Sequence, residues 1–195
     1  MPSYDPRTAL IVVDVQNDFA DPSGSLSVAC GTDVVPILNS AIAAATAEGA
    51  LVAYTQDWHP PTTPHFAKDG GIWPVHCVMD TWGAELHPSL VVDGPTVLKG
   101  SHGEDGYSGF SMRDPRTGET IPTELDGLLR ERGVERVIVG GLATDYCVLQ
   151  TALDARRLGY DTTLLAAGVR AVDLAPGDGD RAIEAMREAG VRIEA

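Results

Sequence analysis

The sequence predicts an α/β protein in which helices cover both faces of one parallel sheet, a three-layer α/β/α arrangement. Residues 8–15 (TALIVVDV) form an unbroken apolar run rich in β-branched side chains, which is typical of a strand buried on both faces. Further apolar runs alternate along the chain with segments of helical composition, which indicates parallel strands joined by helical crossovers. No linker, repeat or low-complexity tract divides residues 1–195, so we expect a single domain.

The first half of the chain predicts a strand, a helix, a second strand and a long loop. After the strand at 8–15, residues 32–48 predict an alanine-rich helix that ends at Gly49. Residues 50–55 (ALVAYT) predict the second strand. The segment 60–95 is rich in Pro, Gly, His and Trp and lacks periodicity. A loop of this length inside a compact domain is more often functional than idle.

The second half continues the alternation of strands and helices. Residues 96–99 predict a short strand that ends at Lys99, and a loop over 100–118 follows. The remaining predicted elements are a helix over 122–132, a strand over 135–140, a helix over 145–158, a strand over 161–166, a helix over 178–189 and a strand over 191–194.

Composition disfavours several classes of partner. The chain has 28 acidic and 14 basic side chains and a net charge of −14, which disfavours binding to nucleic acid or to an anionic membrane surface. Its apolar runs are far shorter than the roughly 18 residues that span a bilayer, and we see no signal-peptide pattern. The three cysteines form no disulfide framework, so we expect a cytoplasmic protein with reduced thiols.

Residues 57–76 contain three of the five histidines and begin with the carboxylate of Asp57. Imidazole nitrogen and carboxylate oxygen are donors that Zn²⁺, Fe²⁺ and Mn²⁺ all accept, so this segment predicts a site for one divalent metal ion without choosing among the three. Taken alone, the segment suggests a metallohydrolase with a metal-activated water. Cys77 is either a further ligand or a packing residue. The candidate ligands are Asp57, His59, His65 and His76.

Cys147 is the candidate nucleophile. Residues 140–147 (GGLATDYC) join a predicted strand to a predicted helix, which places Cys147 near a helix N-terminus. The helix dipole and free backbone N–H groups there lower a thiol pKa and can bind an oxyanion. The alternative is a buried cysteine that packs as a small hydrophobe. Asp14 and Lys99, expected at the same edge of the sheet, favour the nucleophile.

Asp14 and Lys99 are the candidate partners of the thiol. A carboxylate at the end of a buried strand is costly unless it is paired or does chemistry, and Asp14 can take the thiol proton. Its alternative role is to cap the following turn. Lys99 can hold Asp14 ionised and steady developing negative charge, whereas the alternative is an ordinary solvated lysine.

Seven motifs, in order along nearly the whole chain, resemble the isochorismatase-like cysteine hydrolases and, within them, the nicotinamidase/pyrazinamidase branch. Each motif is weak alone, but their ordered combination is specific. The resemblance implies a Cys147–Asp14–Lys99 triad and a six-stranded parallel sheet with flanking helices. The motifs are DVQNDF (14–19), DWH (57–59), HF (65–66), WPVHC (73–77), KG (99–100), YSGF (107–110) and GLATDYCV (141–148).

The same resemblance implies an oxyanion hole and a metal-ligand set. A cis peptide bond between Leu142 and Ala143 would direct the Ala143 and Cys147 amides at an oxyanion. Members of the family differ at the third of the implied ligands, and His87 and His102 match no ligand position. The implied ligands are Asp57, His59, His65 and His76.

The resemblance also implies a pocket for an aromatic ring and a reaction. The reaction is hydrolysis of nicotinamide to nicotinate and ammonia in NAD salvage, through a Cys147 thioester. Pyrazinamide is a second expected substrate, because its ring nitrogen can bind a metal in the same way. The implied ring-pocket residues are Phe19, Trp73, Tyr107 and Tyr146, of which the last varies in the family.

Three other readings stay open. The chain could be an amidase or carbamoyl hydrolase of the same superfamily with another small substrate. An isochorismatase would need neither the cysteine nor the metal-ligand segment. A non-catalytic binding module of the same fold is disfavoured by the presence of Asp14, Lys99 and Cys147. Members of the family often form homo-oligomers, but the sequence contains no diagnostic interface.

Overall fold

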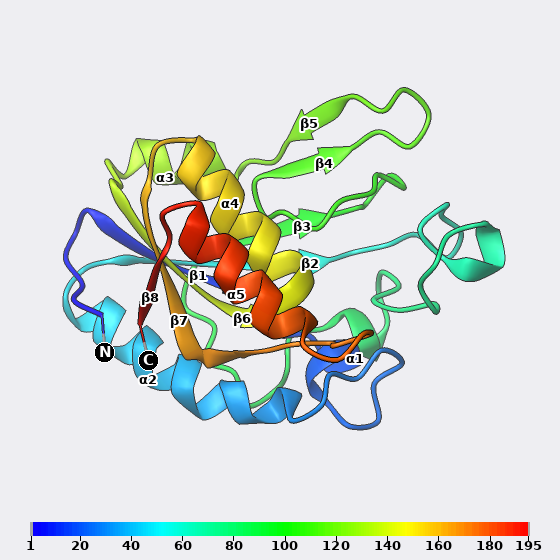
Figure 1. Cartoon of the computed structure of the whole chain (residues 1–195), viewed down its shortest axis with the longest axis horizontal. Helices are drawn as coiled ribbons and strands as arrows, with labels where there is room; N and C mark the ends of the chain where they lie inside the picture. Colours follow the sequence, from blue (N-terminus) through cyan, green and yellow to red (C-terminus); the bar gives the residue numbers. More distant parts are fainter. Residues whose placement is uncertain (1, 195) are drawn as a thin grey trace.

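A six-stranded parallel sheet lies between two layers of helices in the computed structural model, which describes residues 2–194 (Figure 1). The strand order is β3-β2-β1-β6-β7-β8, and every pairing between neighbours is parallel. This architecture confirms the predicted fold class. The strands are β1 (Thr8–Val13), β2 (Leu51–Asp57), β3 (Thr96–Lys99), β6 (Arg136–Leu142), β7 (Asp161–Arg170) and β8 (Arg192–Glu194).

Strand β1 lies in the middle of the sheet and is buried on both faces. Ala9, Ile11 and Val13 belong to the hydrophobic core on one side of the sheet. Leu10 and Val12 belong to the core on the other side. Side chains alternate between the two faces of a strand, so a strand with a core on each side has apolar residues at every position.

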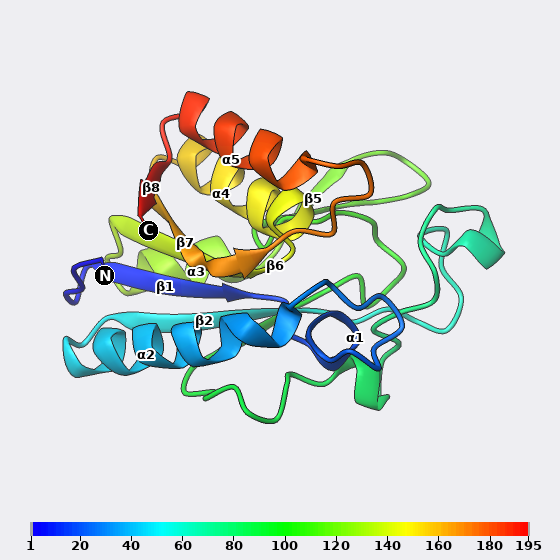
Figure 2. The same cartoon turned by 60° about the horizontal axis from the view of Figure 1, so that its bottom comes forward.

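Helix α2 (Val34–Ala47) covers one face of the sheet, and α3 (Leu125–Glu131), α4 (Leu149–Arg157) and α5 (Asp178–Glu188) cover the other (Figure 2). The buried side of α2 follows the spacing of one helix face. None of the helices in the described part of the chain is long and apolar enough to cross a membrane. The buried residues of α2 are Val34, Val35, Leu38, Ala41, Ile42 and Ala45.

The order of the strands reverses between β1 and β6. From β1 the chain builds outward through β2 and β3 on one side, and from β6 it builds outward through β7 and β8 on the other. The connections at such a switch point diverge and leave a crevice at the carboxyl ends of the central strands, where α/β proteins bind ligands.

Several strand boundaries differ from the predicted ones. β1 ends at Val13 rather than at residue 15, because Asp14 has a φ of 48° and turns the chain. β2 continues to Asp57, and β7 continues to Arg170. Hydrogen bonding to neighbouring strands sets these ends, and it cannot be read from local composition.

The loops predicted around the sheet contain short elements. The loop over 100–118 contains β4 (Ser111–Arg113), which forms an antiparallel hairpin with β5 (Thr120–Pro122). Pro122 therefore ends a strand, and the helix predicted from residue 122 begins at Leu125. A further short helix, α1 (Asn17–Ala20), follows β1 and was not predicted. The other short elements are the 3₁₀ turns Gly31–Asp33, Ala67–Asp69 and Trp82–Ala84.

Candidate active site

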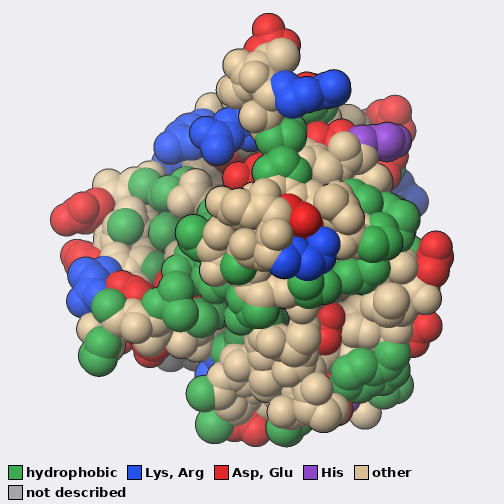
Figure 3. Space-filling model, turned by 90° about the vertical axis from the view of Figure 1, so that its right-hand side faces the viewer, with side chains coloured by type: hydrophobic (Ala, Val, Ile, Leu, Met, Phe, Trp, Pro, Cys, Tyr) green, Lys and Arg blue, Asp and Glu red, His purple; other side chains and the backbone are tan. Residues whose placement is uncertain are grey.

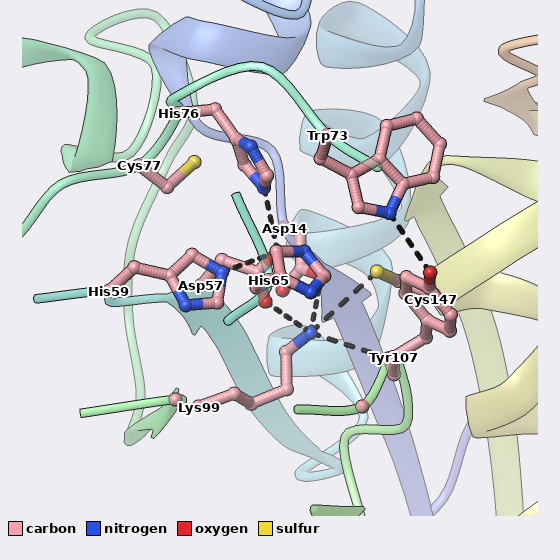
Figure 4. A network of polar contacts seen from close by, with 12 residues as sticks. Asp14, Asp57, His59, His65, Trp73, His76, Cys77, Lys99, Tyr107 and Cys147 are labelled. Atoms are coloured by element: carbon pink, nitrogen blue, oxygen red, sulfur yellow. Dashed lines mark hydrogen bonds and ion pairs between the residues drawn. The ribbon is translucent and has the colours of Figure 1, made fainter. Parts of the chain in front are cut away.

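Four strand ends bring the predicted catalytic residues together. Asp14 follows β1, Asp57 and Lys99 are the last residues of β2 and β3, and Cys147 lies in the turn after β6. All four side chains are buried, and Figure 4 shows them converging on one point. These residues are far apart in the sequence, and they meet because parallel strands place their carboxyl ends at one edge of the sheet.

The ammonium group of Lys99 lies at the centre of this cluster (Figure 4). Its Nζ lies 2.8 Å from Asp14 Oδ2, 2.7 Å from Asp57 Oδ1 and 3.7 Å from Cys147 Sγ. It also donates a hydrogen bond to the backbone oxygen of Tyr107 at 3.3 Å. A fully buried lysine is stable as a cation only when such partners compensate for its lost hydration.

Both carboxylate oxygens of Asp14 accept hydrogen bonds. Lys99 Nζ donates to Oδ2, and the Thr55 hydroxyl donates to Oδ1 at 2.5 Å. Carboxylate oxygens of Asp14 and Asp57 and the sulfur of Cys147 lie within 4.8 Å of one another. Asp14 is therefore held beside the thiol, within reach of a proton on it.

The pKa values of this cluster follow from burial and from its single cation. Burial raises the pKa of Asp14, and Lys99 opposes that shift only in part. Burial raises the pKa of the Cys147 thiol well above its ordinary value, although the charge of Lys99 acts to lower it. Burial alone would lower the pKa of Lys99, but Asp14 and Asp57 hold it well above the ordinary value. The place of Cys147 near a helix N-terminus predicts a lowered thiol pKa, and burial outweighs that effect.

The turn that carries Cys147 has an unusual backbone. The Leu142–Ala143 peptide bond is cis, and residues Thr144–Val148 form a π-helical turn that leads into α4. Before it, Gly141 has a φ of 123°, and a Cβ there would lie 2.1 Å from the backbone oxygen of Val13. Only glycine fits this close approach of β6 to β1.

Three histidines and Asp57 form a second cluster next to the first. Ring nitrogens of His59, His65 and His76 lie within 4.8 Å of one another. Asp57 Oδ2 lies 3.8 Å from His59 Nε2 and 4.0 Å from His76 Nε2. The structure thus brings together all four of the residues that the sequence offered as metal ligands.

The donor set fits a divalent metal ion. Neither ring nitrogen of buried His59 has a hydrogen-bond partner within residues 2–194. His76 donates from Nδ1 to the Pro74 carbonyl at 2.8 Å, which leaves the lone pair of its Nε2 available. Burial lowers the pKa of His76 to about 4, so the ring is neutral at pH 7. Buried nitrogens without partners are costly, and a metal ion would satisfy them.

An apolar pocket lined by residues of both clusters lies between them. Trp73 donates from Nε1 to the Tyr107 hydroxyl at 2.9 Å, and Tyr146 packs edge-on against both rings. The face at this end of the sheet, shown in Figure 3, exposes groups of hydrophobic side chains among charged ones. The pocket is lined by Phe19, Leu26, Asp57, His65, Trp73, His76, Tyr107, Ala143, Tyr146, Cys147 and Val172.

Other candidate residues lie apart from the two clusters. Cys77 is buried, and its sulfur lies 3.9 Å from the Gly83 backbone oxygen rather than among the histidines. Cys30 is exposed, and neither cysteine forms a disulfide. His102 is exposed and pairs with Glu104.

Sequence reasoning missed several residues that shape the site. Thr55, which binds Asp14, lies two positions before Asp57 and so shares its face of β2, a signal that strand periodicity contains. Gln16 donates to the Asp57 backbone oxygen at 2.7 Å and accepts from its N–H at 2.8 Å. Asp18 accepts a hydrogen bond at 2.7 Å from the N–H of Cys77, which is the residue directly after His76. Leu26 and Val172 also line the pocket, and no local sequence pattern marks them as pocket residues.

The chain is similar to known proteins along nearly its whole length. The model of the isochorismatase domain matches residues 8–194. The nicotinamidase/pyrazinamidase of Mycobacterium tuberculosis is 40% identical over 194 residues, which cover 95% of this chain and 97% of that protein. The structure of the Pyrococcus horikoshii pyrazinamidase in complex with zinc has a TM-score of 0.86 and 40% identity, covering 97% of this chain and 99% of that one. The structure of PnC1 from L. infantum in complex with nicotinate has a TM-score of 0.88 and 33% identity, covering 99% of this chain and 95% of that one.

Proposed function

The chain belongs to the isochorismatase family as a nicotinamidase/pyrazinamidase, and we propose that it hydrolyses nicotinamide to nicotinate and ammonia, and pyrazinamide to pyrazinoate. One observation carries this proposal. Cys147 and the histidine cluster line the same apolar pocket, so one small ring can reach both. A pocket with a few converging polar groups in an apolar wall is typical of sites for small molecules.

Covalent chemistry is assigned to Cys147 and Asp14. The sulfur attacks the carboxamide carbon while Asp14 takes the thiol proton, so a C–S bond forms as the C=O double bond opens to an oxyanion. Asp14 then passes the proton to the amide nitrogen, the C–N bond breaks and ammonia leaves a thioester. Water attacks the thioester, Asp14 takes its proton and returns one to sulfur, and the C–S bond breaks to release nicotinate.

The pKa directions support this role for Asp14. A carboxylate with a raised pKa is a stronger base, and the thiol keeps its proton until attack because burial disfavours the thiolate. Lys99 lies near both groups and can stabilise the negative charge as it moves between them. The amides of Ala143 and Cys147 are proposed to donate hydrogen bonds to the oxyanion.

Asp57, His59, His65 and His76 are proposed to hold one divalent ion. When bound, that ion would supply a Lewis-acidic point for a pyridine-type ring nitrogen, which selects the substrate and orients its carboxamide. Zinc, iron and manganese all suit these donors, and the P. horikoshii relative was solved with zinc. Phe19 and Trp73 are proposed to flank the ring, with Tyr107 and Tyr146 completing the wall.

The direct test is ammonia release from nicotinamide by the purified protein, with and without a chelator. Benzamide is the matched control substrate, because it has the same shape and lacks only the ring nitrogen. We expect release from nicotinamide that a chelator abolishes and added zinc restores, and little release from benzamide under either condition. Absence of release from nicotinamide and pyrazinamide with zinc, iron and manganese would refute the proposal.

A further inference from the structure

A carboxylate from a distant loop holds one of the candidate metal ligands. His65 Nδ1 lies 2.7 Å from Oδ1 of Asp105, a residue forty positions further along the chain. A carboxylate can only accept a hydrogen bond, so Nδ1 must carry the hydrogen. The lone pair of His65 then resides on Nε2. We propose that Asp105 is a positioning residue that fixes the ring of His65 for metal binding, an inference that rests on the proposed metal-dependent function.

His65 differs from the other two histidines because a carboxylate is hydrogen-bonded to its ring, whereas the Asp57 carboxylate comes no closer than 3.8 Å to the rings of His59 and His76. His76 is oriented by the Pro74 carbonyl, and His59 has no hydrogen-bond partner among the described residues. A carboxylate partner does more than a carbonyl, because its negative charge also raises the basicity of the ligating nitrogen. His65 is therefore expected to be a strong ligand.

Asp105 is itself held rigidly. Its N–H donates to the Arg113 carbonyl at 2.8 Å, and the Arg113 N–H donates back to the Asp105 carbonyl at 2.5 Å, which ties the loop to strand β4. The Gly106 N–H donates to Oδ1 at 2.9 Å. The Arg113 guanidinium lies 3.7 Å from Oδ2. The β4–β5 hairpin thus acts as the support of a metal ligand that lies in a different loop.

The local backbone does little to orient His65. Its N–H makes a long contact of 3.4 Å with the Thr63 hydroxyl, and its ring stacks on His59 with centroids 4.8 Å apart. Stacking leaves the ring free to flip about its χ2 axis, which would exchange the two nitrogens. The bond to Asp105 removes that freedom.

The test is the zinc affinity of metal-stripped protein, measured by competition with a chromophoric chelator. The variants are Asp105→Ala, Asp105→Asn, His65→Ala and the double variant of Asp105→Ala with His65→Ala. Glu104→Gln is the matched control, since it removes the neighbouring negative charge from a side chain that contacts His102.

We expect Asp105→Ala to weaken zinc binding by about 10- to 100-fold and Asp105→Asn by less, because an amide oxygen can still accept from Nδ1. Glu104→Gln should stay within about twofold of the wild type, as expected for a charge without direct contact. The double variant should bind zinc no more weakly than His65→Ala alone, because the effect of Asp105 passes through His65.

Wild-type affinity in both Asp105 variants would overturn the proposal, and so would an Asp105→Ala effect that persists undiminished when His65 is alanine. The d–d spectrum of the Co²⁺-loaded protein gives an independent readout, and Asp105→Ala should shift it toward that of His65→Ala. If Asp105→Ala does not fold, Asp105→Asn decides alone by the same criteria. These are binding measurements, so a failed amidase assay would refute the proposed function and leave this inference to be judged separately.

Discussion

Lys99 and Asp57 are register partners at the ends of two adjacent parallel strands, and Lys99 Nζ lies 2.7 Å from Asp57 Oδ1. The same nitrogen lies 2.8 Å from Asp14. One buried cation therefore contacts the proposed base and a proposed metal ligand together. The proposed covalent chemistry and the proposed metal site are joined through a single side chain, so a change at Lys99 should affect both.

Replacing Lys99 with methionine keeps the volume of the side chain and removes its charge. Two buried carboxylates would then lack their common cation, so we expect the metal-free protein to lose about 3–5 kcal/mol of its free energy of unfolding. Zinc should restore part of this loss, because a cation beside Asp57 replaces some of the missing charge. Urea unfolding with and without chelator measures both effects. Lys68→Met, at a half-exposed surface pair, is the control, and equal stability of the two variants would contradict the account.

Loss of His76 should act chiefly on substrate binding. With one fewer ligand for the ion, the pocket has a weaker hold on the ring nitrogen, and we expect the KM for nicotinamide to rise at least about tenfold, equal to about 1.4 kcal/mol of binding free energy. Steady-state ammonia release from His76→Ala measures this at saturating zinc. His87→Ala, outside the pocket, should match the wild type. An unchanged KM in His76→Ala would remove the metal from the role of ring anchor.

The bond between Trp73 and Tyr107 should tune the ring pocket. Tyr107→Phe leaves the Trp73 N–H without its 2.9 Å acceptor, and one neutral hydrogen bond is worth about 0.5–1.5 kcal/mol, or roughly a 2- to 12-fold rise in KM. Tyr146→Phe changes the same kind of hydroxyl in the same wall and should change KM by less than about twofold. Equal effects of the two variants would mean that the Trp73–Tyr107 bond does not position the ring.

Stability in acid should depend in part on Asp126, far from the pocket. Burial raises its pKa, but hydrogen bonds from Arg130 Nε at 2.8 Å and the Tyr160 hydroxyl at 2.7 Å outweigh burial, so the pKa lies below its ordinary value of 3.8. A lowered pKa in the folded state stabilises the protein above the pKa of the unfolded state, and the contribution disappears as the pH falls through the folded value.

Asp126→Asn should therefore lower the free energy of unfolding by about 1 kcal/mol between pH 6 and 8, and the difference from wild type should shrink below about pH 4. Denaturant unfolding at several pH values measures this. Glu131→Gln removes an exposed carboxylate from the same helix and is the control. A difference that stays constant down to pH 3 would show that the effect of Asp126 does not come from its charge.

Much of the fold could be predicted because its signals are local. The apolar run at 8–15 contains the central strand, and the convergence of Asp14, Lys99 and Cys147 follows from a general property of parallel sheets. The hairpin of β4 and β5 escaped prediction because strands of three residues contain too little periodicity.

The contacts that tune the site could not be predicted. The pairing of Asp57 with Lys99 depends on the register of β2 against β3, which no local pattern encodes. The contact of Asp105 with His65 joins two loops without periodicity, and it depends on where the hairpin places Asp105. The thiol pKa of Cys147 was predicted in the wrong direction because the depth of burial is a property of the finished fold.

We propose that Cys147 forms a thioester with the ring substrate. The most direct measurement is rapid acid quench of the zinc-loaded protein during turnover of nicotinamide, followed by mass spectrometry of its cysteine peptides. We expect a nicotinoyl group on the peptide that contains Cys147, and a loss of at least about 10³-fold in turnover for Cys147→Ala with zinc still bound. The exposed Cys30, replaced by alanine, should leave turnover unchanged. Substantial ammonia release by Cys147→Ala, or an adduct confined to another cysteine, would contradict it.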